Sequence, residues 1–175
     1  MLIGLCGFKR AGKDTVAAGL VERYGFVRIG FADALRREVE EIYGLTATDA
    51  EKDAPMPDGR SYRDVLIEHG MRRRKEDPDY WVKQASATLR ARPVFDRGVV
   101  FSDCRFPNEL RWVQSHLGVL VWVQRDGVVS NGHITERDWS AECSFTLHND
   151  MAVPSVLAAR VMDRTTRWMP IHRIA

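Results

Sequence analysis

The residues with the clearest chemical meaning stand near the start of the chain, where Gly7, Gly12 and Lys13 fit the spacing G-x-x-x-x-G-K. Glycines at these positions let the backbone curl so that successive N–H groups point at one anion, and the lysine reaches the outer phosphates of a nucleotide. An apolar run precedes Gly7, and a helix that begins near Asp14 would direct its positive end at the same anion. We therefore expect a nucleotide site formed by Gly7, Lys9, Arg10, Ala11, Gly12, Lys13, Asp14 and Thr15.

Three oxygen-bearing side chains are candidate magnesium ligands. Asp14 follows the lysine where Ser or Thr is usual, and because Asp is itself a hard oxygen ligand, Asp14 and Thr15 together can serve a metal and an inner phosphate. Asp103 follows the apolar run 98–102, as the Walker B acid follows its strand in phosphate-loop enzymes. The alternative is that Asp14 only caps a helix and Asp103 only forms a turn.

The densest positive stretch is Arg72, Arg73, Arg74 and Lys75. The pattern predicts a helix over 61–69 that Gly70 ends, and a second helix that Asp77-Pro78 caps, so the four cations would lie in a turn between helices. Cations compressed in this way repel one another unless an anion lies between them, so we expect one or more of the three arginines to bind phosphate. A solvated charged face is the alternative.

Two further segments border the expected site. Asp33 stands at the end of a short strand, 26–29, and could cap a helix that runs to about Tyr43, so Asp33 and Arg36 would lie near the phosphate loop. A simple cap followed by a solvated arginine explains the same pattern. Residues 126–142 are polar and weakly periodic, which is typical of a lid.

The remaining periodicity predicts the elements that must hold these residues in place. The strands are expected at 2–6, 26–29, 98–102, 119–123 and 144–147, and the helices at 14–24, 33–43, 61–69, 78–90, 107–116 and 153–164. The last helix would pack through Val156, Leu157 and Val161. Strands alternating with helices predict a mainly parallel sheet with helices on both faces, and with the site at the carboxyl edge of the strands.

The composition narrows the class of protein. A chain of 175 residues with a net charge of +2 is expected to form one globular domain without a membrane span, and it lacks the charge excess of a nucleic-acid binder. Cys6, Cys104 and Cys143 are an odd set without metal-ligand spacing, which favours reduced thiols and a cytoplasmic location. We assign these cysteines no chemistry.

Six segments together resemble the deoxynucleoside monophosphate kinases of bacteriophages, and the resemblance runs nearly end to end. The most specific is Asp103-Cys104-Arg105-Phe106-Pro107-Asn108-Glu109. The others are Gly7-Phe8-Lys9-Arg10-Ala11-Gly12-Lys13-Asp14-Thr15, Phe31-Ala32-Asp33-Ala34-Leu35-Arg36, Arg63 ahead of Gly70, Asp77-Pro78-Asp79-Tyr80-Trp81-Val82 and His133-Ile134-Thr135-Glu136. The chain departs from the relatives at Gly70-Met71-Arg72, where they tend to read Gly-Thr-Glu, and at Thr135, where they have Ser.

The resemblance implies a three-layer α/β/α P-loop kinase fold in a single domain, 1–175, with an acceptor-binding segment at about 44–92 and a lid at about 126–142. It implies transfer of the γ-phosphoryl group of ATP, with Mg²⁺, to a deoxynucleoside monophosphate, by an enzyme that is a possible homodimer in the cytoplasm of a host. Catalysis would involve Lys13, Arg105, Arg137 and Asp33, and magnesium would bind to Asp14, Thr15 and Asp103. The acceptor would contact Asp33, Arg36, Arg63, Arg72, Arg73, Arg74, Trp81, Arg105 and Glu136.

Other interpretations stay open at this point. Trp81 by its pattern alone is more typical of a core residue. The acceptor could be another phosphorylated small molecule, of the phosphomevalonate or dephospho-coenzyme A type, and the chain could bind nucleotide without transferring phosphate.

Overall fold

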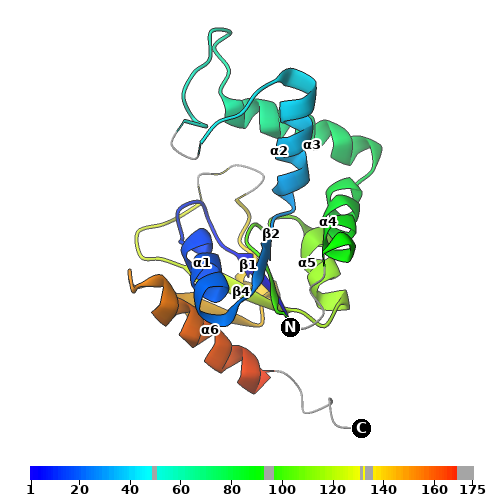
Figure 1. Ribbon diagram of the computed structural model, residues 1–175. Coiled ribbons are helices and arrows are strands. Elements are labelled where there is room, and N and C mark those ends of the chain that lie inside the picture. The colour runs from blue at the N-terminus through cyan, green and yellow to red at the C-terminus, as the bar shows by residue number, and fades with distance from the viewer. Residues whose placement is uncertain (49–50, 93–96, 131, 133–135, 169–175) are drawn as a thin grey trace. The chain divides into compact units, whose positions relative to one another are not determined.

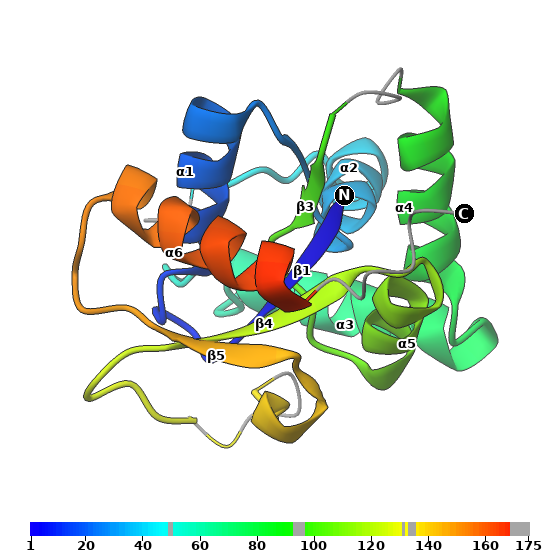
Figure 2. The same cartoon turned by 90° about the horizontal axis from the view of Figure 1, so that it is seen from below.

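The computed structural model describes residues 1–48, 51–92, 97–130, 132 and 136–168. The chain forms two compact units, of which the first contains Met1–Ile29 and Pro93–Ala175 and the second contains Gly30–Arg92. Figures 1 and 2 together label the helices and strands of both.

The first unit is built on a five-stranded sheet of order β2-β3-β1-β4-β5, and each recorded pairing between neighbouring strands is parallel. Valine, isoleucine and leucine dominate the strands, as expected for strands buried on both faces. The bounds are Leu2–Cys6 for β1, Val27–Ile29 for β2, Val99–Phe101 for β3, Val119–Gln124 for β4 and Phe145–His148 for β5. The mainly parallel sheet predicted from the sequence is confirmed.

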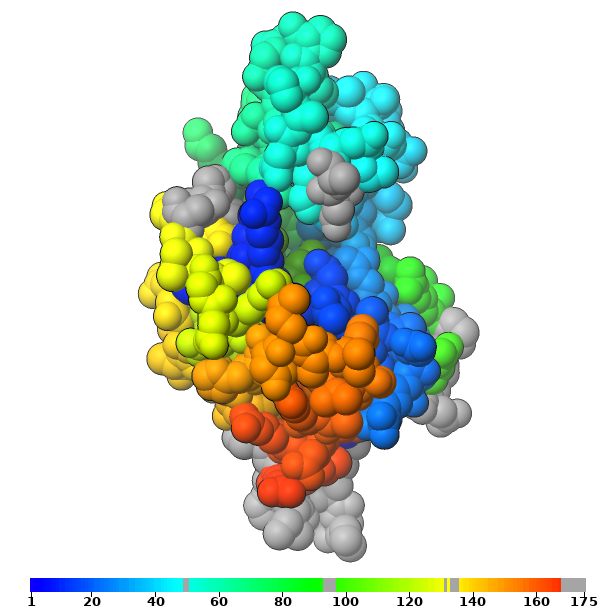
Figure 3. All heavy atoms as spheres, turned by 90° about the vertical axis from the view of Figure 1, so that its left-hand side faces the viewer, coloured from blue at the N-terminus to red at the C-terminus, as the bar shows by residue number. Residues whose placement is uncertain are grey.

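Helices cover both faces of this sheet. α1 (Lys13–Tyr24) and α6 (Pro154–Trp168) pack side by side, and Leu20 and Leu157 share one core cluster with Ile3 and Leu5 of β1. Gly4, between these two strand residues, faces the other way, toward Val113 of α5 (Pro107–Ser115). Figure 2 shows α1 and α6 on one side of the sheet and α5 on the other, and Figure 3 shows α1 in blue beside α6 in orange. The unit therefore has three layers, as predicted.

The packing face of α6 differs from the prediction. Leu157 and Val161 are buried as expected, but Val156 is exposed and Ala158 is buried in its place. A side chain at Gly19 of α1 would collide with the carbonyl of Pro154, because the Cβ would lie 2.1 Å from that oxygen. This close approach of the two helices turns the small residue Ala158, rather than Val156, toward α1.

The second unit consists of three helices, α2 (Ala32–Tyr43), α3 (Tyr62–Glu76) and α4 (Tyr80–Ala91), with turns in the described part of 44–61. α2 contacts both α3 and α4. Val39 of α2 forms a small core with Tyr62 and Val65 of α3. The unit contains the predicted acceptor-binding segment, 44–92, whose role in acceptor binding stays a prediction.

The predicted end of α3 at Gly70 is wrong, because the helix continues to Glu76. Gly70 is buried, a Cβ there would lie 3.2 Å from Leu35 of α2, and its carbonyl accepts a hydrogen bond of 3.1 Å from the indole N–H of Trp81. The glycine therefore serves close packing, and these contacts offset the cost of about 1 kcal/mol for a glycine inside a helix. Arg72, Arg73 and Arg74 accordingly lie in the last turns of α3 and not in a turn between helices.

Two predicted helix caps also differ. Phe31, not Asp33, is the N-cap of α2, and Asp33 lies in the first turn, where its carboxylate accepts a hydrogen bond of 2.7 Å from the backbone N–H of Gly30. Asp77 is the C-cap of α3, in the extended conformation that a residue before proline favours, and α4 begins only after Asp79. Pro78 is therefore a helix breaker here and not the first residue of a helix.

Candidate active site

The carboxyl ends of parallel strands meet at one edge of a sheet, and the chemistry-bearing residues of the first unit follow these ends. Residues 7–12 connect β1 to α1, Asp103 follows β3, and Asn149 directly follows β5. This edge is the one on which doubly wound α/β proteins bind their ligands. It defines the candidate site.

The shape of the phosphate loop depends on its two glycines. Gly7 has a φ of 141°, and an added Cβ would lie 2.4 Å from the carbonyl oxygen of Val123 on β4. Gly12 has a φ of 100°, and its Cβ would lie 2.1 Å from Nδ2 of Asn149. Both positions therefore exclude any side chain, so the glycine spacing seen in the sequence has a steric cause in the neighbouring strands.

Lys13, the first residue of α1, is buried, with an exposed fraction of 6%. Its Nζ donates hydrogen bonds of 2.8 and 2.9 Å to the carbonyls of Gly7 and Phe8. Burial, followed by the positive charge of Arg105, lowers the pKa of Lys13 from 10.5 to about 8, although nearby carboxylates act in the opposite direction. At neutral pH the side chain remains a cation whose hydrogen-bond partners are two backbone carbonyls.

The N-terminus of α1 is open to a ligand. Its N-cap is Gly12, which provides no side-chain hydrogen bond to the first turn, and both Asp14 and Thr15 are exposed. The first N–H groups of a helix and its dipole favour an anion at this position. Loop, lysine and helix end thus lie together at one edge of the sheet, and phosphate binding there stays a prediction.

Hydrogen bonds hold the backbone of the segment after β3 in place. The N–H of Cys104 donates to the carbonyl of Leu5, which ties the segment to β1. Glu109, 1% exposed, accepts hydrogen bonds of 2.8 and 3.1 Å from the backbone N–H groups of Arg105 and Phe106. The carboxylate of this specific motif therefore fixes the backbone of Arg105, while Asp103 and the side chain of Arg105 are partly exposed.

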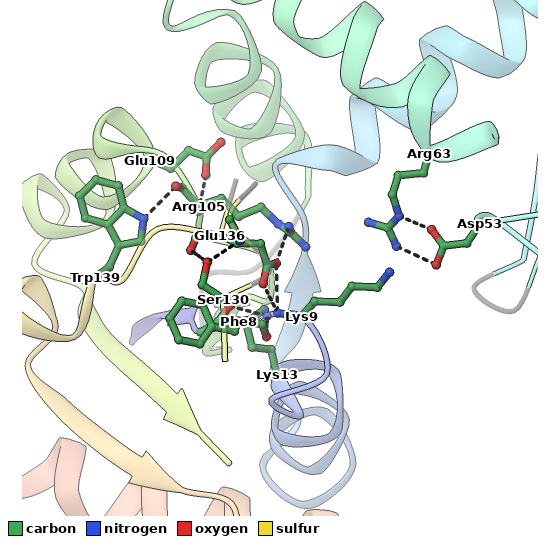
Figure 4. Close-up of polar contacts among 12 residues, drawn as sticks. Phe8, Lys9, Lys13, Asp53, Arg63, Arg105, Glu109, Ser130, Glu136 and Trp139 are labelled. Carbon is green, nitrogen blue, oxygen red and sulfur yellow. Dashed lines mark hydrogen bonds and ion pairs between the residues drawn. The ribbon is translucent and has the colours of Figure 1, made fainter. Parts of the chain in front are cut away.

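Residues 136–139, in the described part of the predicted lid, contact the loop and Arg105 (Figure 4). Glu136 accepts hydrogen bonds from the backbone N–H of Lys9, and its carboxylate lies 3.7 Å from the guanidinium of Arg105. The indole of Trp139 donates 2.9 Å to the carbonyl of Arg105, and the exposed guanidinium of Arg137 lies 4.4 Å from the centre of that indole ring. Residues 131 and 133–135 of this segment, Thr135 among them, lie outside the described residues.

Asn149 is a site residue that the sequence analysis missed. It is buried, its Nδ2 donates a hydrogen bond of 2.8 Å to the carbonyl of Ala11, and its Oδ1 accepts one from Met151. The amide therefore supports the loop directly beneath Gly12. The only signal in the sequence is an asparagine that follows a short apolar strand, and the same signal is typical of an ordinary turn.

Within the second unit, two of the arginines predicted to bind the acceptor lie beside carboxylates of the same unit. Arg63 forms an ion pair with Asp53, and Arg36 lies 3.9 Å from Asp33. The roles of Asp33, Arg36 and Arg63 toward a substrate stay predictions.

The positive cluster of α3, Arg72, Arg73, Arg74 and Lys75, contacts a carboxylate of α2. Glu38 bonds directly to Arg73 and is linked to Arg72 through His69. Glu38 accepts hydrogen bonds from Arg73, Tyr80 and His69, and the other ring nitrogen of His69 lies 3.0 Å from the guanidinium of Arg72. Glu38 therefore neutralises Arg73 without a ligand, and the four cations lie along a helix and not in a turn, which weakens the argument for phosphate binding from charge repulsion. Binding by Arg72, Arg73 or Arg74 remains a prediction on other grounds.

Trp81 is 1% exposed, and its indole N–H is bonded to the carbonyl of Gly70. These contacts support a core role and leave no exposed ring face for stacking with a base.

The three cysteines are brought together in the first unit although they are far apart in the chain. Hydrogen bonding with Cys104 and burial raise the pKa of the Cys6 thiol well above its ordinary value, despite an opposing contact with Cys143. All three are free thiols. Among the described residues no group of three or more His, Cys, Asp or Glu side chains is arranged to hold a metal ion, and no described helix is long and apolar enough to cross a membrane.

Comparison with known proteins agrees with the motifs. No family model matches the chain. A protein of Acanthamoeba polyphaga mimivirus named "Putative deoxynucleotide monophosphate kinase" is similar to it, with 29% identity over 154 residues, which cover 75% of this chain and 77% of the relative. This relative comes from a giant virus, so a bacteriophage source remains a prediction.

Solved structures are similar in fold at low sequence identity. Shikimate kinase from Aquifex aeolicus has a TM-score of 0.51 at 15% identity, over 95% of this chain and 97% of the other. A sugar kinase from Janibacter has a TM-score of 0.50 at 12% identity, over 94% of each chain. The chain therefore has the α/β fold of the P-loop kinases and resembles the viral deoxynucleotide monophosphate kinases, as its motifs predict.

Proposed function

We propose that the protein is a nucleotide kinase that transfers the γ-phosphoryl group of ATP to a deoxynucleoside 5′-monophosphate. One observation carries the proposal: the glycine loop between β1 and α1 holds the buried ammonium of Lys13 at the carboxyl edge of the parallel sheet, the edge at which Asp103 and Arg105 follow β3. A cation, an arginine fork and two carboxylates around a glycine loop are the parts that phosphoryl transfer needs for positioning and charge stabilisation. The similarity to the mimivirus protein supports the choice of acceptor.

The donor side of the proposal uses the loop. ATP would place its outer phosphates against the N-terminus of α1, where Lys13 exchanges its two carbonyl partners for phosphate oxygens. Phosphate is a better partner for an ammonium than a backbone carbonyl, because the hydrogen bond is charge-assisted on both sides. Asn149 holds the loop in the shape that this exchange requires.

The carboxylates fit a magnesium ion that arrives with the nucleotide. Mg²⁺ is usually bound by one or two carboxylates together with phosphates and water, and a preformed cage of protein ligands is not needed. Asp103 and Asp14, with the hydroxyl of Thr15, would hold the ion at this edge, where both carboxylates raise the pKa of Lys13. When bound, the ion would neutralise charge on the transferred phosphoryl group.

On the acceptor side, we assign Arg105 to the monophosphate and Arg137 to the moving phosphoryl group. Glu109 fixes the backbone of Arg105, so its guanidinium can act in both ground and transition states. The contacts of Asp33, Arg36, Arg63 and the arginines of α3 with the acceptor belong to this proposal, as do a lid role for 126–142, a homodimer and a location in host cytoplasm.

A coupled assay of ADP release with a panel of acceptors tests the proposal. Turnover with a deoxynucleoside monophosphate and none with dephospho-coenzyme A, phosphomevalonate, shikimate or gluconate is the expected result. Turnover with one of the other acceptors alone would assign a different kinase. ATP binding without turnover on any acceptor would favour a protein that binds nucleotide without transferring phosphate.

A further inference from the structure

The carboxylate of Glu136 lies where the phosphate loop is expected to hold an anion. Both of its oxygens lie within hydrogen-bond distance of the backbone N–H of Lys9, at 3.0 and 2.9 Å. The side chain is 4% exposed, and the hydroxyl of Ser130 donates 2.8 Å to the Glu136 carbonyl, which holds the residue's backbone in place. Figure 4 shows this carboxylate directed at the loop from the segment that precedes Trp139.

The surroundings of this carboxylate are those proposed for the phosphate chain. Arg105 lies 3.7 Å from it, and its negative charge acts on the Lys13 ammonium. A loop N–H and an arginine thus contact an anion that belongs to the chain itself. Glu136 therefore occupies the Lys9 N–H and neutralises part of the Arg105 charge without any ligand.

A nucleotide phosphate and the Glu136 carboxylate would compete for the same partners, the N–H of Lys9 and the guanidinium of Arg105. The N–H of Lys9 is one donor, and it cannot be given fully to two anions. Two like charges at partly buried sites also repel one another more strongly than in bulk water, because screening by solvent is reduced. Phosphate binding at the loop therefore opposes the present position of Glu136.

We propose that Glu136 is an internal competitor of the nucleotide, which must leave the Lys9 N–H and Arg105 before the phosphates can take them. The inference rests on the proposed function, since it assumes that the loop binds phosphate. It gives Glu136 a role that lowers nucleotide affinity. The resemblance predicted instead a substrate contact, whose loss would weaken binding. The two roles therefore predict opposite effects of the same substitution.

The test is the dissociation constant of inorganic tripolyphosphate and of ATP, measured by isothermal titration calorimetry without an acceptor. Glu136→Gln keeps the size of the side chain and an oxygen that can accept from Lys9, but removes the charge. Glu136→Ala removes both. Glu142→Gln is the matched control, because Glu142 is exposed on the same segment and its substitution changes the net charge equally.

We expect Kd for tripolyphosphate to fall about 5- to 100-fold in Glu136→Gln, the usual range of coupling between two sites, and to be unchanged in Glu142→Gln. Thermal unfolding of Glu136→Gln checks that the variant is folded, and Glu136→Ala should shift Kd in the same direction. An unchanged or raised Kd in both Glu136 variants would overturn the inference, as would an equal shift in Glu142→Gln. Absence of binding in every variant would refute the proposed function itself.

Discussion

Replacement of Lys13 by methionine should remove activity while leaving the fold intact. Two contributions to the free energy of unfolding change with the substitution: the cost of burying the ammonium and its hydrogen bonds to the loop. The pKa of Lys13 falls from 10.5 to about 8, and each pKa unit corresponds to about 1.4 kcal/mol, so the buried ammonium costs the folded state about 3 kcal/mol at neutral pH. Methionine removes that cost. It also removes two hydrogen bonds to the carbonyls of Gly7 and Phe8, which together contribute about 3 to 6 kcal/mol if each is a bond to a charged group.

The lost hydrogen bonds equal or exceed the cost removed, so the free energy of unfolding of Lys13→Met at pH 7 should lie between that of wild type and about 3 kcal/mol below it. The sign of the pH dependence follows from the lowered pKa. Because the unfolded state holds the Lys13 proton more tightly, wild type gains stability as the pH rises from about 8 toward 10.5, and the variant lacks this gain.

The assay combines urea unfolding at pH 7 and pH 9.5 with steady-state turnover of ATP and a deoxynucleoside monophosphate. Loss of the lysine should lower kcat on the order of 10³-fold, as expected for a group that stabilises transition-state charge. Lys83→Met is the control, since Lys83 is an exposed lysine of α4 whose ion pair is with Asp77. A destabilisation beyond about 4 kcal/mol would refute the balance above, and near-native turnover would refute the catalytic role.

Three further predictions concern charges at other positions. Asp103→Asn should lower kcat by orders of magnitude and weaken the magnesium dependence of the rate, whereas an unaltered magnesium titration would make Asp103 a turn residue. Arg105→Ala should chiefly raise KM for the monophosphate, and Arg137→Ala should lower kcat about 10³-fold with little change in KM, so the opposite pattern in steady-state kinetics would reverse their roles. Burial tends to raise the pKa of Glu38, but hydrogen bonds from Tyr80, His69 and Arg73 outweigh it and lower that pKa below its usual 4.5. The stability that the Glu38 charge contributes is therefore complete at neutral pH and lost as the pH falls below about 4.5, so the difference in unfolding free energy between wild type and Glu38→Gln should shrink on acidification, and a constant difference would contradict this.

The features that the sequence predicted correctly are those with a local cause. The positive φ angles of Gly7 and Gly12 are a requirement of the loop's own backbone, and the apolar strands are recognisable from runs of β-branched residues. Pro107 begins α5 as its position predicted. The N–H groups in the first turn of a helix have no partner within the helix, so a proline there loses no hydrogen bond. Patterns of this kind need no knowledge of what packs against them.

The features that it did not predict depend on partners far along the chain. The charges of Arg105 and Glu136 act on Lys13 although both residues are far from it in the sequence, and Asn149 contacts Ala11 across 138 positions. The sequence pattern predicts a helix end at Gly70 because it does not show that this glycine packs against Leu35 of another helix. Tertiary contacts also place Glu38 beside Arg73 of α3, and a charge run alone does not reveal a carboxylate on another helix.

The measurement that tests the central claim most directly is the identification of the product formed from ATP labelled in its γ-phosphate and each of the deoxynucleoside monophosphates. After separation by chromatography, the proposed function predicts that label appears in a deoxynucleoside diphosphate, in equal amount to the ADP formed, and that Lys13→Met forms neither. Label that appears only in inorganic phosphate, or no transfer with any of the monophosphates while ATP binds, would contradict the assignment of the chain as a deoxynucleoside monophosphate kinase.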